Sequence, residues 1–299
     1  MNVRSASWTA RARTACGLAT ALCLGAAASA RAEDPAILSA YFGLDEASVP
    51  LVHPFRLTCA DGDRIDGLPL VLSHEVDQAT IEPQDFLVHT QSGKTLQPNC
   101  ATTNPAGEED EDRTVLLLGE LGDWPSDPPV SVEIVGEVLS EPESDGTVRS
   151  FKGLVSPAIP PYTDGPMLVM AEIVPNEERE LSEAEGGPNC PAGRTLTIVR
   201  LIWSGGVSQF ATDTSGFPPG RGAELGPAQY GRITVDLLQA NGEVVKIHPF
   251  YVGDRDDGDN NNDLCLDRNG VPVAVAVRAK TVTDPMNDWN PATEIEISK

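Results

Sequence analysis

Short runs of alternating or β-branched apolar residues occupy most of the chain beyond residue 33, separated by turns rich in glycine, proline, asparagine and aspartate. Runs of this length and pattern are typical of antiparallel strands in a β-sandwich. No segment carries a sustained apolar period of 3.6 residues, so helix content is expected to be low. We therefore predict an all-β fold, with strands at 36–42, 54–59, 68–73, 85–90, 114–119, 130–139, 167–174, 195–203, 232–238, 244–252, 271–279 and 293–297.

A proline-rich segment divides the chain into two predicted domains. Residues 156–166 hold four prolines in eleven positions, which a central strand cannot accommodate, so we interpret them as a stiff linker. The predicted domains, 33–157 and 158–299, are both β-sandwich-like. In the second, Asn241-Gly242 predicts a hairpin with a type I′ turn, because this dipeptide readily adopts positive φ angles.

One stretch of the first domain has a family pattern. Residues 76–93, VDQATIEPQDFLVHTQSG, resemble the V-D-x-x-T-I-x-P-x-D-F-x-V…S-G segment of bacterial Ig-like modules in surface and S-layer proteins. The resemblance implies an Ig-like first domain, with strands at 68–73 and 85–90 joined through a short helical turn at 77–83. It implies a fold and no activity, since such modules mostly serve as spacers or adhesive elements. The chain as a whole resembles secreted bacterial proteins.

The N-terminus has the pattern of a secretory signal peptide. Arg4, Arg11 and Arg13 accompany a largely apolar run at 15–28, and Ala30-Arg31-Ala32 supplies a small-residue cleavage site. We expect Sec-type export with cleavage near Ala32, giving a secreted or periplasmic protein. No other segment approaches the roughly 20 apolar residues of a transmembrane helix, so none is expected.

The remaining chain is strongly acidic. Residues 1–32 contain four arginines and no acid, so their removal changes the net charge to (21 − 4) − 45 = −28. A field of this sign disfavours nucleic acid and anionic membrane surfaces, and it favours cations or basic partners. The alternative is that the charge serves only solubility.

Four cysteines follow the predicted cleavage site, and an even number in an exported chain predicts disulfides. Of the three connectivities, Cys59–Cys100 with Cys190–Cys265 keeps each pair within one predicted domain. No C-x-x-C pair or Cys/His cluster is present in the sequence to build a tetrahedral zinc site.

The densest group of candidate ligands lies at 254–267, where six aspartates and three asparagines fall within fourteen residues. Closely spaced oxygen ligands with a glycine are what a Ca²⁺ loop requires. The stretch fails the EF-hand pattern, because Gly258 would place Gly253 and Arg255 at ligand positions. A calcium site of another form is expected here, and a solvated hairpin loop is the alternative. The predicted metal ligands are Asp254, Asp256, Asp257, Asp259, Asn261 and Asp263.

A second acidic run, residues 108–112, contains no glycine and is predicted to be a solvated loop, with a metal role as the alternative. Catalytic patterns are missing from the sequence: the four histidines are far apart, and there is no G-x-S-x-G elbow, P-loop or dinucleotide fingerprint. We therefore expect no catalytic residue and no organic cofactor.

These observations together predict a secreted, non-catalytic binding or cell-envelope protein that calcium stabilises. Its expected partner is an extracellular or cell-surface protein or polysaccharide. The alternative is a secreted hydrolase with its site near His248 and the acidic stretch. A third interpretation is purely structural, with acidic loops that only solvate the surface.

Overall fold

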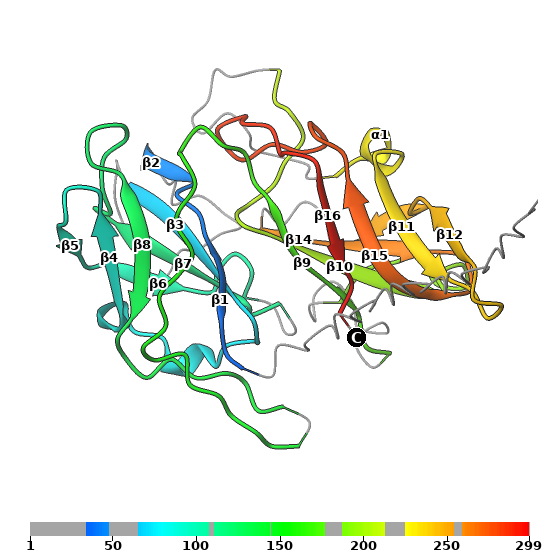
Figure 1. Cartoon of the computed structure of the whole chain (residues 1–299), viewed down its shortest axis with the longest axis horizontal. Coiled ribbons are helices and arrows are strands. Elements are labelled where there is room, and N and C mark those ends of the chain that lie inside the picture. Colours follow the sequence, from blue (N-terminus) through cyan, green and yellow to red (C-terminus); the bar gives the residue numbers. More distant parts are fainter. Residues whose placement is uncertain are drawn as a thin grey trace, which may run out of the picture. The chain divides into compact units, whose positions relative to one another are not determined.

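The computed structural model describes residues 34–47, 65–107, 111–143, 145–176, 187–212, 225–253 and 259–298 (Figure 1). The chain divides into two units, Met1–Arg31 and Ala32–Lys299, and every described residue belongs to the second. With 5% helix, 42% strand and several antiparallel sheets, the predicted all-β, β-sandwich-type class is confirmed. The number of domains stays a prediction.

Two sheets contribute to the first hydrophobic core. Strand β4 shows the expected alternation, with Phe86, Val88 and Thr90 buried and the residues between them only partly so. The larger sheet has the order β1-β3-β7-β6 with β2 pairing β3, and the smaller has the order β5-β4-β8. Their strands are β1 (Ile37–Ala40), β2 (Leu44–Ala47), β3 (Ile65–Leu72), β4 (Phe86–Thr90), β5 (Thr95–Leu96), β6 (Cys100–Thr102), β7 (Thr114–Gly119) and β8 (Pro129–Ile134).

Two four-stranded sheets contribute to the second core, with the orders β13-β14-β10-β9 and β12-β11-β15-β16. Ser298 connects them on one side, because its N–H donates to Ala171 O at 2.8 Å and its carbonyl accepts from Ile173 N–H at 3.2 Å. The elements are β9 (Leu168–Ile173), β10 (Thr197–Trp203), α1 (Pro227–Tyr230), β11 (Ile233–Leu238), β12 (Val244–Ile247), β13 (Tyr251–Gly253), β14 (Asn261–Leu266), β15 (Val271–Val277) and β16 (Thr293–Glu296).

The change from one core to the other falls between Tyr162, which packs against the first, and Leu168, which belongs to the second. The proline-rich segment between the predicted domains lies along β8 in its first part. Ser156 N–H donates to Val132 O at 2.8 Å, and Ile159 N–H donates to Val130 O at 3.1 Å. These residues therefore extend the first set of strands.

The prediction that 254–267 is one acidic loop is wrong for its second half. Residues 261–266 form β14, which lies between β13 and β10 with all six residues buried. Asparagine and aspartate have low β-propensity, so no local pattern predicted a central strand here. Hydrogen bonds and an ion pair to neighbouring strands satisfy these polar side chains and override the local preference.

Two local predictions in the second half also need correction. The single strand expected at 244–252 is two strands, β12 and β13, which pair in different sheets. The hairpin at Asn241-Gly242 is present, since Leu238 pairs with Val244. Its turn is not type I′, because only Gly242 of the two residues has a positive φ, at 85°.

In the stretch that resembles the Ig-like modules, two short 3-10 turns, η1 (Gln78–Thr80) and η2 (Pro83–Asp85), precede β4. The Asp77 carboxylate caps the first by accepting from Ala79 N–H. A strand, a helical turn and a second strand therefore follow one another as the resemblance implies. Membership in that family stays a prediction.

The disulfide predicted between Cys190 and Cys265 is present, with the two Cα atoms 5.8 Å apart. It joins β14 to the segment that precedes β10. Cys100 is also disulfide-bonded. Its predicted partner, Cys59, lies outside the described residues, as does the strand expected at 54–59.

Candidate functional site: a buried acidic network

An ion pair joins β10 and β14 in the interior. Arg200 and Asp263 are register partners, and the Nε and Nη2 atoms of Arg200 each lie 3.1 Å from one carboxylate oxygen of Asp263. Nη2 also lies 3.2 Å from Oε1 of Glu111. Burial alone would lower the pKa of Arg200, but Asp263 and Glu111 raise it well above its ordinary value. Since these side chains are at most 1% exposed, removal of any partner would leave an uncompensated buried charge.

Asp259 and Asn261 extend this group of charges. The Nδ2 of Asn261 donates to Asp259 Oδ2 at 2.8 Å and approaches Oε2 of Glu111 at 3.4 Å. The backbone N–H of Asn261 donates to Oδ1 of Asp259 at 2.7 Å. Asp259 and Asn261 are 2% and 1% exposed, so this amide connects two desolvated carboxylates.

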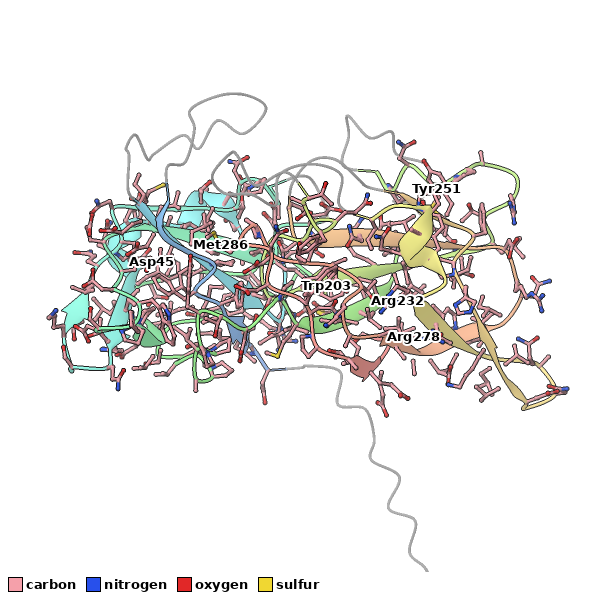
Figure 2. The ribbon with its side chains drawn as sticks, turned by 90° about the horizontal axis from the view of Figure 1, so that it is seen from above. Asp45, Trp203, Arg232, Tyr251, Arg278 and Met286 are labelled. Atoms are coloured by element: carbon pink, nitrogen blue, oxygen red, sulfur yellow. A yellow bond between two sulfur atoms is a disulfide. The ribbon has the colours of Figure 1, made fainter. Side chains whose placement is uncertain are left out.

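Asn260 and Asn262 attach the same segment to β7 and β10. Asn260 Nδ2 donates to Thr114 Oγ1 at 3.0 Å and to the Trp203 carbonyl at 2.7 Å. The indole N–H of Trp203 donates to Asn262 Oδ1 at 3.0 Å. Because Thr114 belongs to the first set of strands and Trp203 to the second, the network connects the strands around both cores. Figure 2 shows Trp203 within the fold.

A second arginine connects the same two sets of strands. Arg113 Nη2 lies 3.0 Å from Glu75 Oε1 and 3.1 Å from Glu172 Oε2, and its Nη1 donates to the Ser73 carbonyl at 2.9 Å. The Arg113 side chain is 13% exposed, so these ion pairs are partly shielded from water. We call the following seven residues the buried acidic network: Glu111, Arg200, Asp259, Asn260, Asn261, Asn262 and Asp263. Arg113 lies two residues after Glu111 along the chain and so borders this network.

Three of the six predicted metal ligands, Asp254, Asp256 and Asp257, lie outside the described residues. The other three are buried members of the network, so the alternative of a solvated loop is wrong for this half of the stretch. Within the described ranges, no group of three or more His, Cys, Asp or Glu side chains has the arrangement of a metal site. The predicted calcium site therefore stays a prediction, and Arg200 already occupies both oxygens of Asp263.

Sequence reasoning missed Arg200 and assigned Glu111 to a solvated loop, whereas Glu111 is 2% exposed. Arg200 had a detectable sign, since it is the one charge in the apolar run TIVRLIW of β10. An arginine at the centre of a buried strand requires a buried carboxylate partner. Its partners are 63 and 89 residues away along the chain, and only the fold identifies them.

A separate polar contact involves Tyr41 and Asp284, which are 1% and 0% exposed. The hydroxyl of Tyr41 donates to Asp284 Oδ2 at 2.8 Å and approaches the Asp164 carbonyl at 2.7 Å. Asp284 Oδ1 accepts from the N–H groups of Met286 and Asp288, which fixes the turn that follows. Burial raises the pKa of Asp284 to about 6, although these hydrogen bonds lower it.

His248, the histidine of the hydrolase alternative, is remote from the buried acidic network along the strands. Its Nδ1 lies 2.6 Å from the Ile233 carbonyl. Phe250, two residues further on, donates to the Cys265 carbonyl, at the opposite end of β14 from Asn261. Four residues of strand separate Cys265 from Asn261, or roughly 13 Å. The geometry therefore gives the hydrolase alternative no support at this position.

Another histidine forms a hydroxyl–imidazole–carboxylate chain on the sheet β5-β4-β8. His89 Nδ1 lies 3.3 Å from Thr95 Oγ1, and its Nε2 lies 3.3 Å from Glu133 Oε2. The side chains of His89 and Glu133 are 32% and 37% exposed. Solvent therefore screens this contact, and we interpret the chain as a surface hydrogen-bond array.

Comparison with known proteins adds no family to these observations. No protein-family model matches the chain, and no curated protein is similar to it. Among the described residues, none of the helices has the length and apolar character needed to cross a membrane.

Proposed function

We propose that this chain is an exported, non-catalytic binding or cell-envelope protein whose aspartate-rich hairpin, between β13 and β14, is stabilised by calcium. The observation that carries the proposal is the excess of buried negative charge. Glu111 and Asp263 pair with Arg200, and Asn261 connects Glu111 to Asp259, so these four ionisable groups carry a formal charge of −3 + 1 = −2 when ionised. Buried charge of this kind is costly unless other groups or a cation compensate it.

The position of the network suggests what calcium would do. Gly253 and Asp263 are register partners, and residues 254–260 connect β13 to β14. This connection includes four of the six predicted ligands, Asp254, Asp256, Asp257 and Asp259. A cation there would neutralise carboxylates and hold the connection in one geometry. Since Asp263 is taken by Arg200, Asp259 is the described carboxylate best placed to contribute.

The non-catalytic part of the proposal rests on the role of these polar groups. Their contacts connect β7, β10 and β14, as in a rigid scaffold, and the described histidines lie elsewhere. An exported scaffold with a strongly negative field would present its surface to cations or basic partners. An extracellular or cell-surface protein or polysaccharide fits this description.

The thermal midpoint of unfolding tests the calcium proposal. We would compare the full chain with the Asp256→Ala/Asp259→Ala variant, in EDTA and in millimolar Ca²⁺. Calcium is expected to raise the midpoint of the wild type and to leave that of the double variant unchanged. The matched control is Asp267→Ala, because Asp267 pairs with the exposed Arg194 and lies outside the network. Equal responses to calcium and EDTA in all three proteins would contradict the proposal.

A further inference from the structure

Two arginines face each other across neighbouring strands at one end of the sheet β12-β11-β15-β16. Ile233 on β11 pairs with Val277 on β15, and the N–H of Arg278 donates to the Arg232 carbonyl at 3.1 Å. Arg232 and Arg278 are the next two residues of this antiparallel register, so they lie directly opposite each other. Figure 2 shows the two labelled residues close together at the ends of β11 and β15. Like charges directly opposite each other destabilise a sheet.

Neither arginine has a carboxylate partner among the described residues, which is unusual for so acidic a chain. Among the described residues, Arg232, Arg278 and nearby Lys280 form no ion pair with an acid. Glu294 pairs with Ala276, two residues before Arg278, and contacts neither arginine in an ion pair. Of the other eight described lysines and arginines, Arg268 is the exception and seven have acidic partners: Lys94, Arg113, Arg149, Lys152, Arg194, Arg200 and Lys246.

Local hydrogen bonds fix the Arg232 side chain and the backbone of the turn that follows β15. Arg232 donates through Nη2 to the Ala279 carbonyl at 2.6 Å and through Nε to Thr281 Oγ1 at 3.3 Å. The side chain of Asn290, 1% exposed, donates to the Arg278 carbonyl at 3.1 Å and accepts from Thr281 N–H at 2.7 Å. The turn that carries Arg278 and Lys280 is therefore fixed before any ligand arrives.

Lys280 has an unfavourable backbone conformation within this turn. Its φ is 61°, in the left-handed region that glycine or asparagine adopts at lower cost. Its N–H donates to the Asn290 carbonyl at 3.0 Å, which maintains this conformation. Lys280 and Arg278 are exposed and Arg232 is partly exposed, so their charged groups are accessible from solvent.

We propose that Arg232, Arg278 and Lys280 form a binding site for a compact tetrahedral oxyanion, that is, a phosphate or sulfate group on a small molecule. An anion of charge near −2 with several acceptor oxygens matches two guanidinium groups and one ammonium group better than a single carboxylate does. It would also relieve the repulsion between the opposed arginines. The negative field of the whole chain repels extended polyanions and anionic surfaces, so the ligand is small.

Calorimetric titration with inorganic phosphate, and separately with sulfate, tests this site at constant ionic strength. Arg278→Gln/Lys280→Gln removes two exposed cations, and Arg268→Gln is the matched control because Arg268 is an exposed, unpaired cation before the other end of β15. For each anion, the wild type and the Arg268→Gln control are expected to have the same affinity. The double variant should bind at least tenfold more weakly. Absence of saturable binding to the wild type, or equal binding by all three proteins, would overturn the proposal.

Vesicles that contain phosphatidic acid provide a second arm, which separates a lipid headgroup from a soluble ligand. We expect no co-sedimentation of the wild type with these vesicles. Vesicle binding without binding of inorganic phosphate would overturn the assignment to a small ligand. The site shares no residue with the buried acidic network, so its failure and that of the calcium proposal are distinguishable.

Discussion

Arg200 and Asp263 lie directly opposite each other on β10 and β14 and form a bidentate ion pair from which water is almost wholly excluded. Glu111 approaches the same guanidinium from outside this pair of strands. Arg200 is therefore a buried charge within a strand, β10, whose other residues are uncharged. This arrangement makes the stability of the fold depend on charge balance in its interior.

Loss of Arg200 is expected to destabilise the protein severely. Arg200→Met should lower the free energy of unfolding by about 3–5 kcal/mol, because Asp263 and Glu111 would remain buried without their partner. Urea unfolding followed by circular dichroism measures the change. The double variant Arg200→Met/Asp263→Leu should be more stable than Arg200→Met alone. A loss below about 1 kcal/mol in the single variant would show that the ion pair is not desolvated.

Asp284 is expected to make stability depend on pH. Its raised pKa of about 6, caused chiefly by burial, means that the folded state retains a proton that the unfolded chain releases near pH 4. The stabilisation of the folded state by this retained proton is therefore fully present below about pH 4 and declines as the pH rises to about 6. In Asp284→Asn, the loss of unfolding free energy between pH 4 and pH 7 should shrink by up to about 3 kcal/mol.

Urea unfolding at pH 4, 5.5 and 7 would measure this dependence. Asp66 provides a second test, because burial also raises its pKa to about 6, against the hydrogen bonds from Glu46 and Leu121. Asp66→Asn should reduce the same slope. If Asp284→Asn kept the full slope of the wild type, then another group would be responsible for it.

Gly165 is expected to tolerate no side chain. A Cβ atom at this position would approach the carbonyl carbon and oxygen of Trp289 to a distance that no real contact allows, and this obstacle is backbone. Gly165→Ala should cost about 1–3 kcal/mol through overpacking. The control, Gly231→Ala, meets nothing within 4 Å and has a φ of −70°, so its thermal midpoint should change little. Equal midpoints for the two variants would contradict the close approach of Gly165 to Trp289.

The Cys190–Cys265 disulfide closes a loop of 75 residues. The chain-entropy model gives about 4 kcal/mol, as an upper estimate, for a loop of this length. Cys190→Ala/Cys265→Ala should therefore unfold at clearly lower urea concentration than the wild type. Mass spectrometry under non-reducing conditions would confirm the pairing. A variant as stable as the wild type would show that the bond constrains little.

The apolar pattern predicted most of the fold because its strands obey the alternation that a half-buried sheet imposes. Strands β4 and β11 are examples, with buried residues at every second position. Strand β14 escaped prediction, since its first three residues are Asn261, Asn262 and Asp263. Their burial is compensated by contacts with β10, Glu111 and Asp259. Such long-range partners carry no local signature in the sequence.

The candidate sites differ in the same way. The acidic stretch was conspicuous in composition, and the structure gave its second half a buried role. The group of Arg232, Arg278 and Lys280 is invisible in the sequence, because 46 residues separate the two arginines and only the register of β11 and β15 brings them together. The prediction of a type I′ turn at Asn241-Gly242 was wrong for a local reason, because a positive φ at Gly242 alone is enough to close the hairpin.

Direct measurement of calcium binding tests the central claim. The full chain, freed of metal with EDTA and dialysed, would be titrated with Ca²⁺ in a calorimeter beside Asp256→Ala/Asp259→Ala and the Asp267→Ala control. We predict saturable, stoichiometric binding to the wild type and to the control, and its loss in the double variant. Absence of stoichiometric binding to the wild type, or unchanged binding to the double variant, would contradict the claim that calcium stabilises this hairpin.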